Sequence, residues 1–150
     1  MRLTSDEEIS NLLSATKTIA IIGVSNKPHR DSYKVFRFLC DEGFTVIPVN
    51  PALASTNLDG HEVMASLADI NLPIDLVDVF RNSNALPDIV NAAIHKDAKA
   101  IWTQLGVVHD GAINTALSHE LDIVIDRCPA IDIPRLKSLN LPTGPRSHPV

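Results

Sequence analysis

Apolar residues along the chain alternate between short continuous runs and helical spacings. Ile9, Leu12 and Leu13 have helical spacing and follow a Ser-x-x-Glu capping box that begins at Ser5, which predicts a first helix. Residues 19–22 then form an unbroken apolar run, which is typical of a buried parallel strand. Along the whole chain the pattern predicts helices over residues 5–15, 32–42, 84–95, 111–119 and 128–139, and strands over residues 17–24, 44–49, 74–80, 98–103 and 122–126.

This regular alternation of strand and helix favours a single α/β domain. Strands rich in Val and Ile that are separated by helices form parallel sheets, in which right-handed crossovers place helices on both faces. We therefore expect a Rossmann-like, doubly wound, mainly parallel sheet over residues 1–140. Residues 141–150 contain three prolines and a glycine, and we expect them to form a loose tail.

Two prolines modify the predicted elements. Pro48 has no N–H to donate, so the strand over residues 44–49 should be weakly paired on one side, where a short edge strand at residues 62–64 would fit. Pro134 falls within the last predicted helix, and we expect it to break that helix.

Composition argues against several classes of protein. The net charge of −5 disfavours nucleic-acid binding, which depends on a basic surface. The first residues lack the apolar core of a signal peptide, and no apolar stretch approaches the ~20 residues that span a bilayer, so we expect a cytoplasmic protein without membrane contact. Cys40 and Cys128 form no Cys-x-x-Cys pair and the six histidines lack ligand spacing, so no metal site is expected.

The loop after the first strand is the most informative segment of the chain. The apolar run ends at Gly23, and a polar loop with Ser25, Lys27 and Arg30 leads to Ser32, where the next helical pattern begins. A strand, a turn and a helix start in this order are typical of phosphate sites, because the first N–H groups of a helix lack intrahelical partners. A nucleotide-like ligand is therefore our first hypothesis. Without a ligand, the glycine would serve only a tight turn and the cations would be solvated.

The residues that follow the later strands are further candidates, because ligands of doubly wound sheets bind beyond the carboxyl ends of the strands. Those with suitable chemistry are Asn50, Pro51, Phe80, Arg81, Gln104 and Cys128. Phe80 and Cys128 could equally be core residues. Trp102 lies inside a strand with apolar neighbours, and we expect it in the core.

Classical dinucleotide binding fits this chain poorly. The loop after Gly23 contains no second or third glycine to admit a pyrophosphate close to the helix. The second strand ends at Asn50, where an NAD site has Asp or Glu for the ribose diol. An NAD(P)-binding, oxidoreductase-like domain stays open as an alternative.

Five segments carry a family resemblance. They are Ile21–Pro28, Val46–Pro51, Val77–Arg81, Ile101–Gln104 and Asp126–Cys128. In order and spacing they resemble the small, single-domain coenzyme A-binding proteins, which share a Rossmann-like fold with the CoA-binding domain of the succinyl-CoA synthetase α subunit. Two positions depart from the family pattern: Val24 stands where Ala is common, and Asp132 where a Glu usually follows the Arg-Cys pair.

The resemblance implies coenzyme A as the cofactor. The Gly23–Ser25 turn and the helix start at Ser32 would hold the phosphates, and Lys27 and Arg30 would neutralise them. Asn50-Pro51 would flank the adenosine, where a carboxylate would repel the 3′-phosphate. Further along the edge, Phe80-Arg81 would lie beside the adenine or the pantetheine arm, Gln104 would contact the ligand, and Cys128 would face its thiol.

We interpret the chain as a CoA-binding module, regulatory or thiol-linked, rather than an enzyme. No serine with a paired base is apparent in the sequence, and the resemblance does not include the phosphohistidine-bearing domain of the synthetases or their nucleotide-grasp partner. A CoA-transfer enzyme that acts with a partner is a second alternative. The sequence indicates neither the oligomeric state nor whether free CoA or an acyl-CoA is bound.

Overall fold

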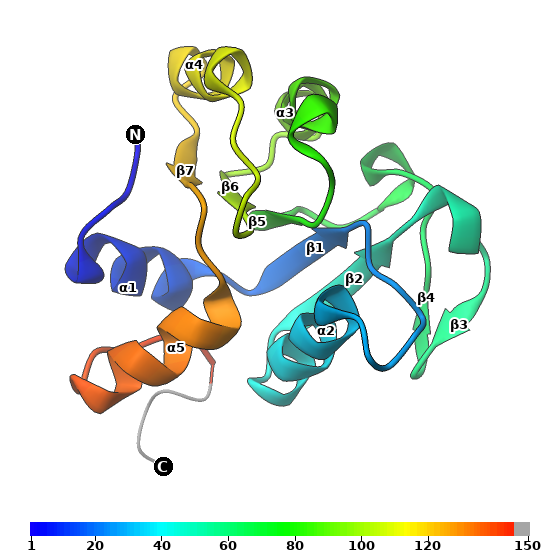
Figure 1. Ribbon diagram of the computed structural model, residues 1–150, viewed down its shortest axis with the longest axis horizontal. Helices are drawn as coiled ribbons and strands as arrows, with labels where there is room; N and C mark the ends of the chain where they lie inside the picture. The colour runs from blue at the N-terminus through cyan, green and yellow to red at the C-terminus, as the bar shows by residue number, and fades with distance from the viewer. Residues whose placement is uncertain (146–150) are drawn as a thin grey trace.

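The computed structural model describes residues 1–145 and shows a sheet of five parallel strands (Figure 1). In order across the sheet, the strands are β2 (Thr45–Val49), β1 (Thr18–Ile22), β5 (Leu76–Val79), β6 (Ala100–Thr103) and β7 (Asp122–Val124). Beside β2 lies a separate antiparallel pair, β3 (Asn57–Leu58) and β4 (His61–Glu62).

Helices cover both faces of the sheet (Figure 1). One face carries α1 (Asp6–Ala15), α2 (Asp31–Asp41) and α5 (Pro129–Ser138), and the other carries α3 (Leu86–His95) and α4 (Asp110–Ser118). Short 3-10 turns occur at Pro51–Leu53, Leu67–Asp69 and Ser83–Ala85. The main predicted helices and strands all end within two residues of their predicted bounds, and the Rossmann-like, doubly wound fold is confirmed. No helix in residues 1–145 is long and apolar enough to span a membrane.

The sheet separates two apolar cores. Ile19 and Ile21 of β1 pack with α1, α2 and α5, whereas Ala20 between them packs with α3 and α4, as the alternation of side chains along a strand requires. Trp102 is fully buried, as expected, and its indole N–H donates to the carbonyl oxygen of Arg127 at 2.9 Å. Burial on both faces explains why these strands are unbroken apolar runs in the sequence.

The direction of winding reverses at β1. The chain passes from β1 to β2 on one side and then crosses back to β5 on the other, so the carboxyl ends of β1 and β5 form the topological switch point. Gly23 lies at this point with a φ of +87°, and a Cβ added to it would lie 2.2 Å from the carbonyl oxygen of Phe80. Only glycine allows the two strand exits to approach so closely.

The β2 edge of the sheet is covered by a single residue of the following segment. Met64 donates its N–H to the carbonyl oxygen of Pro48 at 2.9 Å and accepts from the N–H of Asn50 at 2.9 Å. Pro48 therefore lies on the outer edge, as its missing N–H requires. The expected edge strand at residues 62–64 is reduced to this bridge, because Glu62 pairs with Asn57 in the β3–β4 hairpin instead.

The β7 edge is covered by the amino-terminal residues. The N–H of Leu3 donates to the carbonyl oxygen of Ile123 at 2.9 Å, and the N–H of Ile123 donates to the carbonyl oxygen of Met1 at 3.0 Å. The terminal ammonium of Met1 also donates to the carbonyl oxygen of Leu121 at 2.7 Å. The outward-facing groups of β7 are thus already paired.

The expected break at Pro134 is wrong, because α5 runs without interruption from Pro129 to Ser138. Pro134 lies on the exposed side of the helix, whereas Ile133 and Leu136 are fully buried. A proline in a helix interior removes one backbone hydrogen bond. Tertiary packing of the opposite face of α5 compensates for that loss.

Asp132 joins α5 to two other parts of the fold. Its carboxylate, with a side chain 5% exposed, accepts from the guanidinium of Arg127 at 2.8 and 2.9 Å and from that of Arg135 at 3.2 Å. Arg135 also pairs with Asp6 of α1 at 2.8 Å. Asp132 therefore serves as the partner of Arg127, so the first residue of the Arg-Cys pair stabilises the fold.

The segment after α5 lies against α1 and the start of β2. Ser10 donates its hydroxyl to the carbonyl oxygen of Pro142 at 2.5 Å, and Thr143 is buried. A Cβ added to Gly144 would lie 2.5 Å from Cζ of Phe44. The start of the expected loose tail is thus packed as far as Gly144, and residues 146–150 of that expectation lie outside the described residues.

Replacing Gly23 with Ala should lower the free energy of unfolding by about 2 to 5 kcal/mol, because the positive φ strains any side chain and the Phe80 carbonyl leaves no space. Gly60 is the matched control: its φ is +88°, and nothing lies within 4 Å of an added Cβ. Gly60→Ala should cost only the strain, about 1 to 2 kcal/mol. Urea unfolding of both variants measures the difference, and equal losses would show that contact with Phe80 constrains nothing.

Candidate functional site

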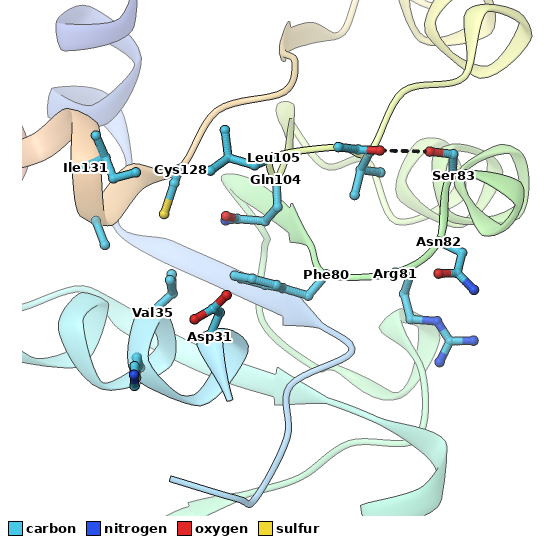
Figure 2. Close-up of a pocket in the computed structure, with 14 residues that line it drawn as sticks. Asp31, Val35, Phe80, Arg81, Asn82, Ser83, Gln104, Leu105, Cys128 and Ile131 are labelled. Carbon is cyan, nitrogen blue, oxygen red and sulfur yellow. Dashed lines mark hydrogen bonds between the residues drawn. The ribbon is translucent and has the colours of Figure 1, made fainter. Parts of the chain in front are cut away.

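The carboxyl edge of the sheet carries three adjoining hollows. The cationic cavity, of about 650 Å³, is lined by Gly23, Ser25, Lys27, His29, Arg30, Asp31, Ser32 and Phe80. The central cavity, of about 740 Å³, is lined by Asp31, Lys34, Val35, Phe80, Arg81, Asn82, Ser83, Gln104, Leu105, Gly106, Val107, Cys128, Ala130 and Ile131 (Figure 2). The edge cavity, of about 270 Å³, is lined by Ile22, Gly23, Val49, Pro51, Ala65, Ser66, Leu67, Arg81, Ala85, Asp88, Ile89 and Ala92.

Shared wall residues join the hollows into one groove. Asp31 and Phe80 line both the cationic and the central cavity, Gly23 lines the cationic and edge cavities, and Arg81 lines the central and edge cavities. The groove therefore crosses the switch point between β1 and β5, where ligands of such sheets bind. Within residues 1–145, no group of three or more His, Cys, Asp or Glu side chains could hold a metal ion.

Hydrogen bonds within the loop after β1 fix its shape. The buried Ser32 hydroxyl accepts from the N–H of Ser25 at 2.9 Å, and the Ser25 hydroxyl accepts from the N–H of Lys27 at 3.0 Å. Two predicted phosphate residues thus brace the loop. Arg30, the N-cap of α2, makes no side-chain cap hydrogen bond, and it lines the cationic cavity together with Asp31 and Ser32 of the first helical turn.

The charged side chains of the cationic cavity are exposed. Lys27 and Arg30 supply two positive charges and Asp31 one negative charge, which leaves a net charge of +1 in a chain whose net charge is −5. His29 lines the same cavity. Asp31 and His29 were not among the predicted site residues, although both lie in the loop between β1 and α2 or at its end. The local excess of positive charge suits an anionic group.

Val24 and Asn50 are not among the residues that line the three hollows. The Val24 side chain is fully buried in the core. The amide of Asn50 donates to the carbonyl oxygen of Val24 at 2.8 Å and accepts from the N–H of Ala52 at 2.9 Å. These contacts hold the exit of β2 against the loop after β1. Of the predicted Asn50-Pro51 pair, it is Pro51 that lines the edge cavity.

Phe80 and Arg81 lie where β5 ends and point in different directions (Figure 2). The half-buried Phe80 ring packs against the core beneath α2 and forms the partition between the cationic and central cavities. Arg81 is exposed, and its guanidinium points away from the Phe80 ring. The structure therefore brings both predicted residues to the groove. Phe80 contributes an apolar wall, and Arg81 contributes a charged one.

Gln104 lines the central cavity, but its amide nitrogen is already used. Nε2 of Gln104 donates to Oδ1 of Asp78 at 2.6 Å, and Gln104 is only 4% exposed. Asp78 itself is fully buried, and its Oδ2 has no hydrogen-bond partner among the described residues. Burial raises the pKa of Asp78 to about 7, although the hydrogen bond from Gln104 opposes the rise.

Asp78 was not among the predicted site residues. Its signal was a single acidic residue inside the otherwise apolar strand Leu76–Val79. Buried carboxylates are rare unless they are paired, so an acidic residue at such a position is informative. Asp78 stands opposite Trp102 of β6, and Gln104 follows two residues later on the same face.

Cys128 is the cysteine on the groove. It lines the central cavity at the N-cap of α5 and is half-buried. Burial raises the pKa of its thiol; the N–H groups of Ala130 and Ile131 oppose the rise, and nearby carboxyls add to it. Cys40 lies on α2, with its Sγ 3.9 Å from Nε2 of His61, and is not among the residues that line the groove.

Asp78→Asn should change the pH dependence of stability. The unfolded carboxyl loses its proton near pH 3.8 and the folded one only near pH 7, so rising pH between these values lowers the free energy of unfolding of the wild type. Relative to the wild type, the variant should gain up to about 4 kcal/mol between pH 4 and pH 8. Urea unfolding at both pH values measures this gain. Asp41→Asn is the control, because the Asp41 side chain is 72% exposed, and its stability relative to the wild type should change little between the two pH values. A similar gain in both variants would contradict the raised pKa of Asp78.

Comparisons with known proteins bear on the family and the fold of the chain. Residues 17–134 match the family described as a CoA binding domain. An uncharacterized protein of Bacillus subtilis (strain 168), YneT, is 34% identical over 128 residues, which cover 85% of this chain and 93% of YneT. A solved structure from Thermus thermophilus is 34% identical in sequence and has a TM-score of 0.85. The match covers 89% of this chain and 99% of that chain.

The structure of a hypothetical protein from Pyrococcus horikoshii OT3 is also 34% identical and has a TM-score of 0.84. That match covers 89% of this chain and 92% of the other chain. Because the family match spans the whole sheet and the strand exits that line the groove, the chain belongs to the CoA binding domain family.

Proposed function

We propose that this chain binds coenzyme A as a cofactor-binding module, with the ligand lying along the groove. The observation that carries the proposal is the order of chemistry in the three hollows. The cationic cavity, with Lys27 and Arg30, adjoins the edge cavity on one side of Gly23 and the central cavity at Phe80. Coenzyme A has the same order, because its diphosphate lies between an adenosine and a pantetheine arm.

The loop after β1 would hold the diphosphate. The first N–H groups of α2 donate to phosphate oxygens, and the side chains of Lys27 and Arg30 neutralise them. Gly23 lets the ligand approach the backbone at the switch point. Ser25 and Ser32 act by bracing the loop, as their hydrogen bond at 2.9 Å supports.

The two ends of the ligand would occupy the two outer hollows. The adenosine lies in the edge cavity beside Pro51, and Arg81, which borders this cavity, reads the 3′-phosphate. The pantetheine arm passes the Phe80 ring into the central cavity and ends near Gln104 and Cys128. The contiguous groove supports this placement.

The exit of β2 favours coenzyme A over NAD. An NAD site uses a carboxylate there to accept hydrogen bonds from the ribose diol. Here Asn50 stands at that exit, and its amide is engaged by Val24 and Ala52. A neutral residue suits a ligand whose ribose carries a phosphate, since a carboxylate would repel it.

Reversible binding, rather than disulfide exchange, is the primary mode that we propose. Exchange requires a thiolate, and burial raises the pKa of the Cys128 thiol. The thiol is therefore mostly protonated at neutral pH. A regulatory module of this kind responds to the concentration of its ligand rather than to the redox state of the cell.

Coenzyme A should raise the melting temperature of the protein more than NAD or NADP at equal concentration. A ligand that binds only the folded state stabilises it by RT ln(1 + [L]/Kd), so the shift ranks the affinities. Dephospho-CoA should give a smaller shift than coenzyme A if a cation reads the 3′-phosphate. Differential scanning fluorimetry with the four ligands measures this order. A larger shift with NAD or NADP would instead favour an oxidoreductase-like domain.

Lys27→Ala should weaken coenzyme A binding by about 1 to 3 kcal/mol, the range for a charge-assisted hydrogen bond. Stability should change little, because the side chain is exposed. Lys17→Ala is the matched control, since Lys17 is also exposed but precedes β1, at the opposite edge of the sheet. Titration calorimetry decides: equal affinities of the two variants would mean that Lys27 is merely solvated.

A further inference from the structure

Two large aliphatic side chains are exposed at the mouth of the central cavity. Leu105 is 61% exposed and follows β6, and Ile131 is 58% exposed in the first turn of α5. Figure 2 shows them on either side of Cys128. Exposed aliphatic residues that border one concave site mark a surface that binds apolar groups.

The same cavity has an apolar wall that consists of Val35 from α2, the Phe80 ring, Val107 and Ala130. Its lining also includes the charged residues Asp31, Lys34 and Arg81 and the polar residues Asn82 and Ser83. A pantetheine arm carries two amide groups and so does not by itself explain an aliphatic wall of this extent.

The polar groups behind the wall disfavour an anionic occupant. Gln104 faces the cavity with its amide nitrogen bound to Asp78, whose second carboxylate oxygen is buried without a partner among the described residues. Cys128, on the same wall, is half-buried. A carboxylate brought to the Gln104–Cys128 end of the cavity would lie beside the buried carboxyl group of Asp78, whereas the cations of the lining, Lys34 and Arg81, come from α2 and the segment after β5.

We propose that the central cavity receives an uncharged aliphatic acyl group, carried as a thioester on the pantetheine arm, so that the ligand of this chain is an acyl-CoA. This inference rests on the coenzyme A binding proposed above and names the form of the ligand. Leu105 and Ile131 close over the acyl chain, and the apolar wall removes it from water.

Titration calorimetry of the full chain with coenzyme A, butyryl-CoA, hexanoyl-CoA and succinyl-CoA tests this inference. Hexanoyl-CoA should bind about tenfold more tightly than butyryl-CoA, because two further methylenes are buried. The acyl chain of succinyl-CoA has the same number of carbons as that of butyryl-CoA but ends in a carboxylate. Succinyl-CoA should therefore bind at least about tenfold more weakly than butyryl-CoA.

Two variants connect that preference to the cavity. Leu105→Ser and Ile131→Ser should each lower the ratio of hexanoyl-CoA affinity to coenzyme A affinity by about threefold to tenfold. Leu139→Ser is the control, because Leu139 is 52% exposed and does not line the cavity, and it should keep the wild-type ratio.

The outcomes separate the two proposals. Tight binding of free coenzyme A with equal or weaker binding of the aliphatic acyl-CoAs would overturn the acyl inference and leave the proposed function intact. The acyl inference would also be overturned if the ratio of hexanoyl-CoA affinity to coenzyme A affinity were unchanged in both Leu105→Ser and Ile131→Ser. If neither coenzyme A nor any acyl-CoA binds, the proposed function fails and the acyl inference with it.

Discussion

The close approach of Gly23 to the carbonyl group of Phe80 is the constraint on which the rest of the structure depends. It brings the exits of β1 and β5 together at the point where the winding reverses, with 2.2 Å between that oxygen and any added Cβ. The same two residues border all three hollows between them. One backbone contact thus determines how the sheet is assembled and where the groove runs.

The sheet could be predicted from the sequence because strands that are buried on both faces consist of continuous runs rich in Val and Ile. The edge position of Pro48 was predictable for the same local reason, since a missing N–H excludes the middle of a sheet. Pro134 misled the prediction because the packing of Ile133 and Leu136, distant in sequence from their partners, outweighs a local rule. Asp78 was missed because only the register between β5 and β6 brings Gln104, 26 residues away, to its carboxylate.

Residues of the predicted site divide into those that line the groove and those that build it. Lys27, Arg81 and Cys128 line it, and their positions in the segments that follow strands made them predictable. Val24 and Asn50 instead lie behind the groove, where the side-chain amide of Asn50 donates a hydrogen bond to the carbonyl oxygen of Val24 at 2.8 Å. The sequence pattern is the same for residues that line the groove and for residues that hold it in shape. The two can be told apart only from the hydrogen bonds of the folded chain.

The covered edges of the sheet limit how this domain can assemble. At β2, Met64 and Pro48 leave Val46 as the one outward-facing strand residue still open for pairing, and at β7 Leu3 and Met1 occupy Ile123. An exposed strand edge is the usual route by which one sheet continues into another or captures an extended peptide. Among the described residues, the five-stranded sheet leaves that route open only at Val46. A partner that docks without displacing Met64 or the amino-terminal residues would therefore use the helices, the β3–β4 hairpin or the loops around the groove, where ligand binding can influence the contact.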